Sequence, residues 1–325
     1  MSKISVVIPV WNAAKWIGST LDSLGAQTHT DFEAIMIDDG STDDSAEICR
    51  RYCAGDPRFR LVQQVNAGVS AARNRGIEES SGDLLTFLDA DDMLPPDSLA
   101  VMLRLHDETG AAIVAGRYLR TSDPERLCRE WTGKDSATAK HEVAPSDEAI
   151  RRGLYQKRIF NYPGGILYAH DVLRGSGAPR FRDCRYEDLD FFYRAFERAG
   201  EICVTDAVTC LYRDTPGSFM NSWSASRLDV LDVTDRIERH FSGRDAHLLR
   251  AARDRRFSAH YNMLVEMIRH GVGNPEQERR CLSVIRDLRS GILADPEVRI
   301  KNKIGALISY LGTPAIRLIS RLSPK

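Results

Sequence analysis

Residues 4–38 read ISVVIPVWNAAKWIGSTLDSLGAQTHTDFEAIMID, and this stretch decides the fold. The run at 4–10 is rich in β-branched residues and predicts a strand, whereas the apolar residues of 13–26 recur at helical spacing. A second apolar run at 32–38 predicts another strand. A strand, a helix and a strand in such close succession are typical of a βαβ unit, which joins parallel strands.

The same alternation continues further along the chain. The residue patterns predict helices at 43–53 and 69–80, and strands at 59–64 and 83–89. Short buried strands that alternate with amphipathic helices form a parallel sheet, and the ligands of such a sheet bind beyond the carboxyl ends of its strands. We therefore expect an α/β fold with its functional site at that edge.

The remainder of the chain falls into three parts. Residues 121–160 are polar and rich in arginine, and their pattern assigns no element. A helix is predicted at 186–199, followed by strand-like residues at 202–204 and 207–213. Beyond residue 222 the pattern predicts only helices, at 224–241, 245–270, 276–290 and 296–322. Pro314 interrupts the last of these helices.

Composition narrows the range of functions. Of the 325 residues, 42% are apolar and 28% are charged, which excludes a mainly disordered chain. Lysine plus arginine number 45 and the acids 46, so the net charge of −1 predicts no nucleic-acid partner. The 7 cysteines show no zinc-type pattern. With no signal peptide and no apolar run of about 18 residues, we expect a cytoplasmic protein.

Two acidic runs follow predicted strands. IDDGSTDDS at 37–45 places Asp38 and Asp39 at a strand end, and LTFLDADD at 85–92 ends in three neighbouring carboxylates. Carboxylates this close raise one another's pKa unless a cation or a hydrogen-bond donor holds them. Oxygen ligands left partly open suit Mg²⁺ or Mn²⁺ that also binds substrate phosphates.

A third run, NAGVSAARNRG at 66–76, lies between the two acidic runs. Gly68 lets a helix begin close to the site, and Arg73 and Arg75 offer guanidinium groups to phosphate, although Arg75 also fits an exposed helix face. The first predicted strand-to-helix turn, PVWNAAKW, contains no glycine. This excludes the glycine-rich turn of a dinucleotide-binding fold.

These blocks, in this order, resemble the family 2 inverting glycosyltransferases with the GT-A fold. The likeness covers about residues 3–215, and its main blocks are the opening stretch through DDGSTDDS, then GVSAARNRGI and FLDADD. It implies a mixed α/β sheet flanked by helices in a catalytic domain at 1–221, with a nucleotide-sugar half at 1–120 and an acceptor half at 121–221. Residues 222–325 would form a C-terminal helical extension.

The resemblance also implies binding residues for a nucleotide-sugar donor. Carried over by position, it places Pro9, Trp11 and Asp39 around the nucleotide base. Trp11 stands where many relatives have tyrosine, and its ring still offers a face for stacking. Arg73 would lie near the donor nucleotide and Asp89 near its ribose.

In the DADD run, the resemblance implies a divalent metal, Mn²⁺ or Mg²⁺. Asp91 would bind it, with Asp92 as the alternative ligand, and the sequence leaves open which acid takes which role. An alternative interpretation of the same run is a haloacid-dehalogenase-like phosphatase with Asp89 as nucleophile, although the motif of those phosphatases normally lies on the first strand.

The acidic pair Glu187–Asp188 opens the helix predicted at 186–199. A carboxylate in a first helical turn is held ionised by the helix dipole and can take a proton from a hydroxyl, but acids at this position also simply stabilise helices. The resemblance makes Asp188 the general base, with Glu187 beside it. Tyr212, Arg213 and Ser218 match a weaker YR…S element that would order over the leaving diphosphate or the acceptor.

The function implied is inverting transfer of a sugar from a nucleotide-diphospho-sugar, a UDP-sugar by family expectation, to a hydroxyl of a glycan or lipid-linked acceptor. Three alternatives remain: the phosphatase, a sugar nucleotidyltransferase, and a non-catalytic glycan-binding module. The nucleotidyltransferase would need a glycine-rich first loop, which PVWNAAKW is not.

The C-terminal stretch 299–325 holds six lysines and arginines and no acid. Ile304, Leu307, Ile308 and Leu311 fall on one face of its predicted helix, and Ile316, Ile319 and Leu322 follow after Pro314. A basic amphipathic stretch can lie on an anionic membrane surface, which would place the protein peripherally on the cytoplasmic face. It can equally pack on the body of the protein or on a second subunit of a homodimer, and the sequence leaves both open.

Overall fold

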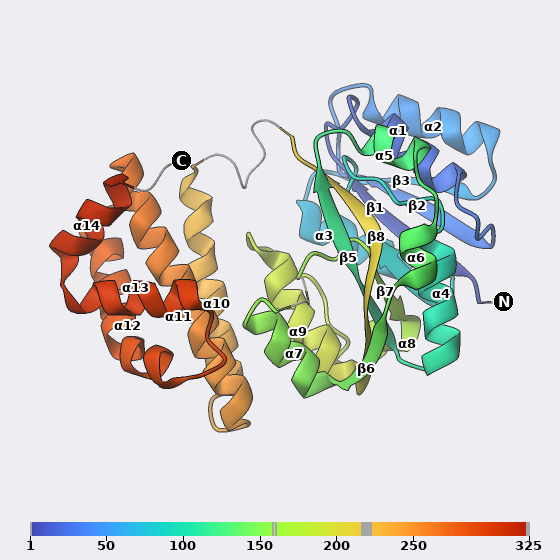
Figure 1. Ribbon diagram of the computed structural model, residues 1–325. Coiled ribbons are helices and arrows are strands. Elements are labelled where there is room, and N and C mark those ends of the chain that lie inside the picture. The colour runs from blue at the N-terminus through green and yellow to red at the C-terminus, as the bar shows by residue number, and fades with distance from the viewer. Residues whose placement is uncertain (1, 158, 160, 216–222, 323–325) are drawn as a thin grey trace. The chain divides into compact units, whose positions relative to one another are not determined.

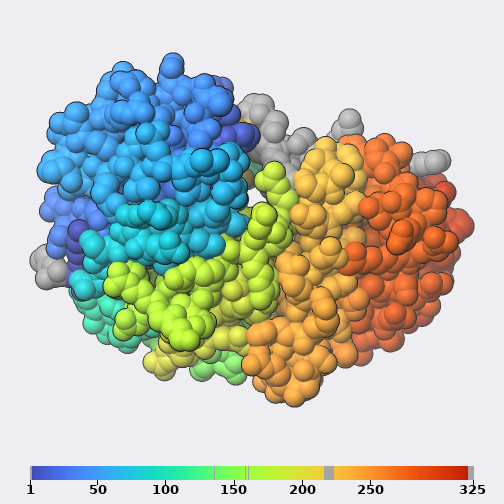
Figure 2. All heavy atoms as spheres, turned by 180° about the vertical axis from the view of Figure 1, so that it is seen from behind, coloured from blue at the N-terminus to red at the C-terminus, as the bar shows by residue number. Residues whose placement is uncertain are grey.

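The computed structural model describes residues 2–157, 159, 161–215 and 223–322. The chain forms two compact units (Figure 1). The first comprises residues 1–149 and 158–215, and the second comprises 150–157 and 216–325. Figure 2 shows their surfaces by residue number, with the helices after residue 223 in yellow-orange to red.

The first unit is built on one sheet with the strand order β3-β2-β1-β4-β7-β5-β8-β6. The strands are β1 (Ile4–Val10), β2 (Phe32–Asp38), β3 (Phe59–Gln63), β4 (Leu84–Phe87), β5 (Ile113–Thr121), β6 (His141–Pro145), β7 (Ile166–Ala169) and β8 (Glu201–Arg213). The four strands predicted from the first ninety residues are all present and parallel. Strand β7 pairs antiparallel with both β4 and β5, so the sheet as a whole is mixed.

Helices connect and cover these strands. In the first unit they are α1 (Ile17–Gly25), α2 (Ser45–Gly55), α3 (Val69–Glu79), α4 (Ser98–Thr109), α5 (Pro124–Arg129), α6 (Lys134–Thr138), α8 (His170–Leu173) and α9 (Glu187–Ala199). A further helix, α7 (Ser146–Leu154), crosses the boundary between the units. Residues 121–160, which the sequence left unassigned, therefore contain α5, α6, β6 and α7.

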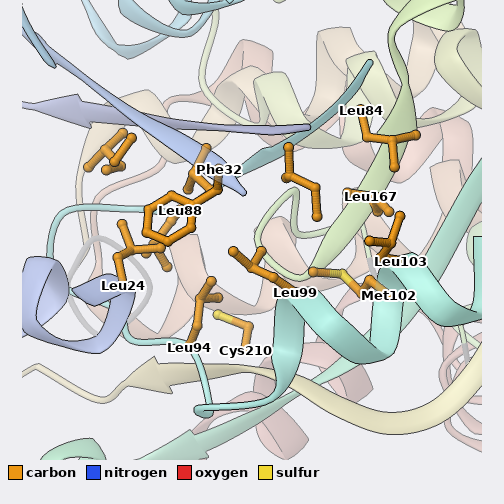
Figure 3. Close-up of a cluster of buried hydrophobic side chains, with 14 of the residues drawn as sticks. Leu24, Phe32, Leu84, Leu88, Leu94, Leu99, Met102, Leu103, Leu167 and Cys210 are labelled. Carbon is orange, nitrogen blue, oxygen red and sulfur yellow. The ribbon is translucent and has the colours of Figure 1, made fainter. Parts of the chain in front are cut away.

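Strand β1 is buried along its whole length because both faces of the sheet are covered. Val6 and Ile8 belong to the cluster that packs under α1 and α4, where Leu88, Leu99 and Met102 also lie (Figure 3). On the opposite face, a Cβ atom on Gly76 of α3 would lie 2.1 Å from a methyl carbon of Val7. Only glycine therefore allows α3 to approach β1 this closely.

Aromatic side chains attach the start of α9 to the end of β4. The rings of Phe181 and Phe191 stack at 3.9 Å, and both meet Phe87 edge to face at 5.2 and 6.2 Å. All three side chains are buried. This packing brings the segment before α9 to the carboxyl edge of the sheet, although about a hundred residues separate it from β4 in the sequence.

The second unit is helical in its described residues, as the sequence predicts. Its helices after residue 223 are a 3₁₀ turn at Ala225–Leu228 followed by α10 (Asp229–Phe241), α11 (Ala246–His270), α12 (Pro275–Ala294), α13 (Ile300–Tyr310) and α14 (Thr313–Leu322). The last predicted helix is divided in two near Pro314, as expected. In the described part of the chain, no helix has the length and apolar character needed to cross a membrane.

The units divide the chain slightly differently from the domains expected at 1–221 and 222–325. Residues 150–157 join the second unit, where Tyr155 donates a hydrogen bond to Asp295 at 2.5 Å and Arg151 forms an ion pair with Glu297. A second difference concerns 202–204 and 207–213, which form the single long strand β8. The domain assignment itself stays a prediction.

Candidate active site

The site lies at the carboxyl edge of the parallel strands, where β1, β2 and β4 end at Val10, Asp38 and Phe87. The backbone N–H of Asp39 donates to the carbonyl of Val10 at 2.8 Å, which joins the first two strand ends. Pro9 is buried within β1, whereas the Trp11 side chain that follows is 59% exposed. The exposed ring of Trp11 is available for stacking.

Asp39 is buried and held by donors from the loop before α3. Its Oδ1 accepts hydrogen bonds from Gln64 Nε2 at 2.7 Å and the Ala67 N–H at 2.8 Å, and its Oδ2 accepts one from the Gly68 N–H at 2.8 Å. Gly68 has a φ of +90°, a backbone conformation that favours glycine. The carboxylate of Asp39 therefore shapes this loop and the start of α3.

Arg73 connects three segments that are far apart in the sequence. Its Nη2 donates to Oδ1 of Asp89 at 2.8 Å, and its Nη1 donates to Oε1 of Glu187 at 2.6 Å. The residue is only 3% exposed, and burial opposes its charge, but the two carboxylates outweigh burial and raise the pKa of Arg73. The turn after β4 and the first turn of α9 are thus held at one site.

The three acids of the DADD turn have different surroundings. Asp89 is paired with Arg73. Asp92 is buried, and its carboxylate accepts hydrogen bonds from the Arg213 N–H at 2.8 Å and from the Tyr162 hydroxyl. Burial and the two neighbouring acids raise the pKa of Asp92. The structure therefore distinguishes acids that the sequence could not.

Asp91 differs from its two neighbours because its carboxylate has no side-chain hydrogen bond or ion pair among the described residues, and only its own backbone N–H approaches it. Burial, followed by the charge of Asp89, raises the pKa of Asp91 to about 6. Such a group is stabilised in its charged form by an added cation. Within the described residues, no cluster of three or more histidine, cysteine or acidic side chains could by itself hold a metal ion. A metal bound by Asp91 would therefore need further oxygens from a substrate.

Arg213 supports the DADD turn from the end of β8. Its Nη1 and Nη2 donate to the two carboxylate oxygens of Glu125 at 2.8 and 2.7 Å, and its Nε donates to the carbonyl of Asp91 at 2.7 Å. The guanidinium also lies 4.6 Å from the ring centre of Trp16. The side chain is buried in these contacts, so Arg213 holds the turn in place. Ser218, which the sequence grouped with Arg213, lies outside the described residues.

Three tyrosines form a cluster beside the DADD turn, and the sequence singled out only Tyr212 among them. The rings of Tyr118, Tyr162 and Tyr212 lie 5.5 to 5.7 Å from one another. Burial, with the charges of the three acids, raises the pKa of Tyr212 to about 12, so its hydroxyl stays protonated at neutral pH. Tyr118 and Tyr162 come from β5 and from a loop, and no sequence motif marks either as a site residue.

Asp188 lies in the first turn of α9, next to the Glu187 that binds Arg73. Tyr186, the residue before the helix, has a φ of +60°, an unusual conformation for a residue other than glycine. One oxygen of Asp188 accepts a hydrogen bond from the Leu189 N–H at 2.7 Å. Burial is the main cause that raises the pKa of Tyr118 and of Tyr168, and the charge of Asp188 adds to it in both. Asp188 therefore lies near the tyrosine cluster.

A model of the family described as glycosyl transferase family 2 matches residues 5–176, more than half of the chain. The chain belongs to this family. One relative, described as an uncharacterized glycosyltransferase EpsJ of Bacillus subtilis, is 30% identical over 66% of this chain and 62% of its own length. The chain thus spans less than two thirds of that relative.

Solved structures agree on the fold. S. aureus TarS residues 1–349, determined in complex with UDP-GlcNAc, match 98% of this family 2 chain and 88% of the TarS 1–349 chain with a TM-score of 0.69 at 20% identity. The mannosyltransferase PcManGT of Pyrobaculum calidifontis, in complex with GDP-Man and Mn²⁺, matches 96% of this chain and 87% of its own with a TM-score of 0.56 at 15% identity. These likenesses show a shared GT-A fold.

Proposed function

We propose that this chain transfers a sugar, with inversion, from a UDP-sugar to a hydroxyl of a glycan or lipid-linked acceptor. The observation that carries the proposal is the pair of ion pairs made by buried Arg73, with Asp89 on one side and Glu187 on the other. Through them the DADD turn and the acidic pair of α9 share one site. An acid cluster that can hold a divalent cation on the diphosphate and a helix-borne carboxylate base are the two parts that the proposed reaction needs.

In the proposed mechanism, Asp188 takes the proton of the acceptor hydroxyl. The acceptor oxygen then forms a bond to the anomeric carbon while the bond from that carbon to the diphosphate oxygen breaks on the opposite side. The electron pair of the broken bond leaves with the nucleoside diphosphate, so one base is sufficient. The position of Asp188 in a first helical turn favours its ionised form, as this role requires.

The leaving diphosphate would be bound beside the DADD turn. Asp91, whose half-buried carboxylate has no side-chain partner among the described residues, would hold Mn²⁺ or Mg²⁺ together with diphosphate oxygens. When bound, such a cation neutralises charge on the departing diphosphate. Asp92 is less suited to this role, because both of its oxygens already accept hydrogen bonds from the protein. We propose that Arg213 positions the turn through its contact with the Asp91 carbonyl.

The nucleotide end of the donor would lie at the edge of β1 and β2. The exposed ring of Trp11 offers a stacking face, and buried Pro9 places it at the end of β1. Asp39 would accept the N3–H of uracil through its Oδ2, which accepts only one hydrogen bond within the protein. The nucleotide sugars bound by TarS and PcManGT support this class of donor.

The experiment that tests the proposal is the replacement Asp188→Asn. The amide keeps the shape of the side chain but cannot take a proton at neutral pH, so turnover should fall by about 10²–10⁴-fold. Binding of the UDP-sugar, measured by calorimetry with Mn²⁺, should be unchanged. Nucleoside diphosphate release from a panel of UDP- and GDP-sugars, with acceptor mixtures, identifies the donor and measures turnover.

Glu187→Gln provides the matched control, because it changes the neighbouring acid in the same way and keeps an oxygen that accepts from Arg73. Its turnover should fall less than that of Asp188→Asn. Wild-type turnover in Asp188→Asn, or a larger loss in Glu187→Gln, would contradict the assignment of the base. Hydrolysis of p-nitrophenyl phosphate without any nucleotide would favour the phosphatase with Asp89 as nucleophile.

A further inference from the structure

Helix α13 of the second unit packs through a face made of small and polar residues. Asn302, Gly305, Ala306 and Ser309 are its buried positions. The Asn302 side-chain amide donates to Oδ1 of buried Asp254 at 2.7 Å. Farther along the helix, a guanidinium nitrogen of Arg289 in α12 donates to the carbonyl of Ser309 at 3.0 Å. These polar contacts fix which way α13 is rotated.

Close backbone contact fixes the same rotation. A Cβ atom on Gly305 would lie 3.2 Å from the ring of Tyr261 in α11, so a larger residue would displace that ring. A rotation that turned leucine or isoleucine inward would bring a larger side chain against Tyr261 and break the buried hydrogen bond between Asn302 and Asp254. The side chain of Asp254 would then be buried without its amide partner, which is costly.

Four large apolar residues of this segment consequently face outward, whereas Ile308, which the sequence placed on the same face, is half-buried. Ile300, Ile304, Leu307 and Leu311 recur at the spacing of one helical face, and they are 76%, 51%, 56% and 74% exposed. In an ordinary surface helix these residues would form the buried side. A continuous exposed apolar face of this kind marks a surface that binds something. We call these four residues the α13 face.

Charges border the α13 face. By helical spacing, Lys301 and Lys303 project from its two sides, and neither forms an ion pair within the described residues. No acid occurs anywhere in 299–325, and the sequence from 222 onward carries 19 basic and 12 acidic residues. An apolar stripe with a lysine on each side suits the boundary between lipid headgroups and acyl chains, where lysine stems lie along apolar surface and their ammonium groups reach phosphate.

We propose that the α13 face docks on an anionic lipid surface. The helix would lie flat, with its four apolar side chains among the acyl chains and its lysines on lipid phosphates. The charge of the segment favours an anionic lipid surface over a second copy of the chain. A two-fold contact through the same face would bring together two basic segments with no acid in 299–325 to neutralise either. The proposal does not depend on the proposed reaction.

Co-sedimentation of the full chain with vesicles tests the proposal. Wild-type protein should bind phosphatidylcholine vesicles that contain phosphatidylglycerol and bind pure phosphatidylcholine vesicles much more weakly. The double variant L307E/L311E should bind anionic vesicles at least about tenfold more weakly because its apolar face is lost. K301E/K303E should lose a similar factor on anionic vesicles and nothing on neutral ones. Val272→Glu is the matched control, since Val272 is an exposed apolar residue of the same unit outside the face, and it should bind as wild type does.

Circular dichroism and a thermal melt establish that each variant is folded, and K301E/K303E keeps the test decisive if L307E/L311E does not fold. Absence of wild-type binding to anionic vesicles overturns the proposal, as does binding that neither α13 variant weakens. A lipid-free dimer in analytical ultracentrifugation that L307E/L311E dissociates, without vesicle binding, would assign the face to a second copy. A monomer that does not bind vesicles would indicate that the α13 face makes contacts within the chain. Both the dimer and the monomer result, each without vesicle binding, would overturn the lipid proposal.

Discussion

The turns after β2 and after β4 present acids at the same edge of the sheet, but their carboxylates have different partners. In the turn after β2, the donors that Asp38 and Asp39 have among the described residues are all neutral, namely backbone N–H groups and glutamine amides. In the turn after β4, Asp89 has the cation of Arg73 and Asp92 has neutral donors. Asp91 has no partner among the described side chains.

This difference shows that the role of a buried acid depends on its partners. A carboxylate supplied with donors by its own chain stabilises a loop, as Asp39 stabilises residues 64–68. One that lies beside other acids without a donor favours an external cation. The same residue type therefore stabilises a loop in the turn after β2, where we propose that Asp39 also contacts the donor base, and in the turn after β4 we propose that it binds the metal of the diphosphate.

The largest expected effect follows from removing the cation between the two carboxylates. Arg73→Met should lower the free energy of unfolding by about 3–5 kcal/mol, because Asp89 and Glu187 would face each other without their buried partner. Urea unfolding measures the change. Arg75→Met is the matched control on the same helix, since Arg75 is exposed and forms an i,i+4 pair with Glu79, its one ion pair in the described part of the chain, and it should cost less than about 1 kcal/mol. Equal losses in the two variants would mean that the bridge is not structural.

The next effect concerns the role that we propose for Asp91 in catalysis. Asp91→Asn should reduce turnover by at least about 10²-fold, because the proposed metal would lose its protein ligand. Its stability should not fall, since the wild-type carboxylate has no side-chain partner to lose. Turnover assays with and without EDTA check this, and EDTA should have little further effect on the variant. Wild-type turnover in Asp91→Asn would exclude it as the metal ligand.

A pH series sharpens the same distinction. The pKa of Asp91 is raised to about 6 in the folded, metal-free protein, above the value of about 4 in the unfolded chain. Between these values the unfolded state has released the proton and the folded state still binds it, so stability falls as the pH rises from about 4 to about 6. Relative to Asp91→Asn, wild-type protein should lose about 2 kcal/mol over this range, measured by urea unfolding in EDTA. A constant difference between the two proteins would contradict the shift.

The smallest effect is expected in the turn after β2. Asp39→Asn replaces one acceptor oxygen by an NH₂ group, so at least one of the donors from Gln64, Ala67 and Gly68 loses its partner. The free energy of unfolding should fall by about 1–2 kcal/mol. Thermal unfolding without ligand measures this. A stability equal to wild type would show that these hydrogen bonds contribute nothing net, and Asp39 would then resemble Asp91.

Much of the sheet could be predicted because its cause is local. The apolar runs at 4–10 and 32–38 correspond to β1 and β2, since buried parallel strands need nearly continuous apolar sequence. The strand predicted at 59–64 corresponds to β3 within a residue, although β3 is mostly half-buried. Residues 121–160 could not be assigned because β6 is mostly exposed, so it lacks the alternation of apolar and polar residues that predicts a strand. Helices α5 and α6 are too short to show the 3.6-residue repeat of apolar residues that predicts a helix.

The site could be predicted as a set of acids and an arginine but not as a set of contacts. Tyr118 and Tyr162 carry no motif, and their place beside the acids comes from the pairing of β5 with β8 and from the hydrogen bond to Asp92. For Arg73 the sequence indicated a phosphate-binding role, which stays a prediction. The structure shows a different use of its charge, in the two ion pairs with Asp89 and Glu187.

By itself the sequence determined the alternation of strands and helices, and with it the edge of the sheet at which the acids of residues 38–39 and 89–92 meet. These features follow from local spacing and from the fact that parallel strands end together. Only the tertiary structure decided which acid receives a donor, a cation or no partner, and which side of α13 faces outward. Those outcomes depend on Arg73, Tyr162 and Asp254, whose contacts with Glu187, Asp92 and Asn302 span 114, 70 and 48 residues of sequence. Local pattern carries no information about such distant pairs, because their free energy appears only when the chain has folded.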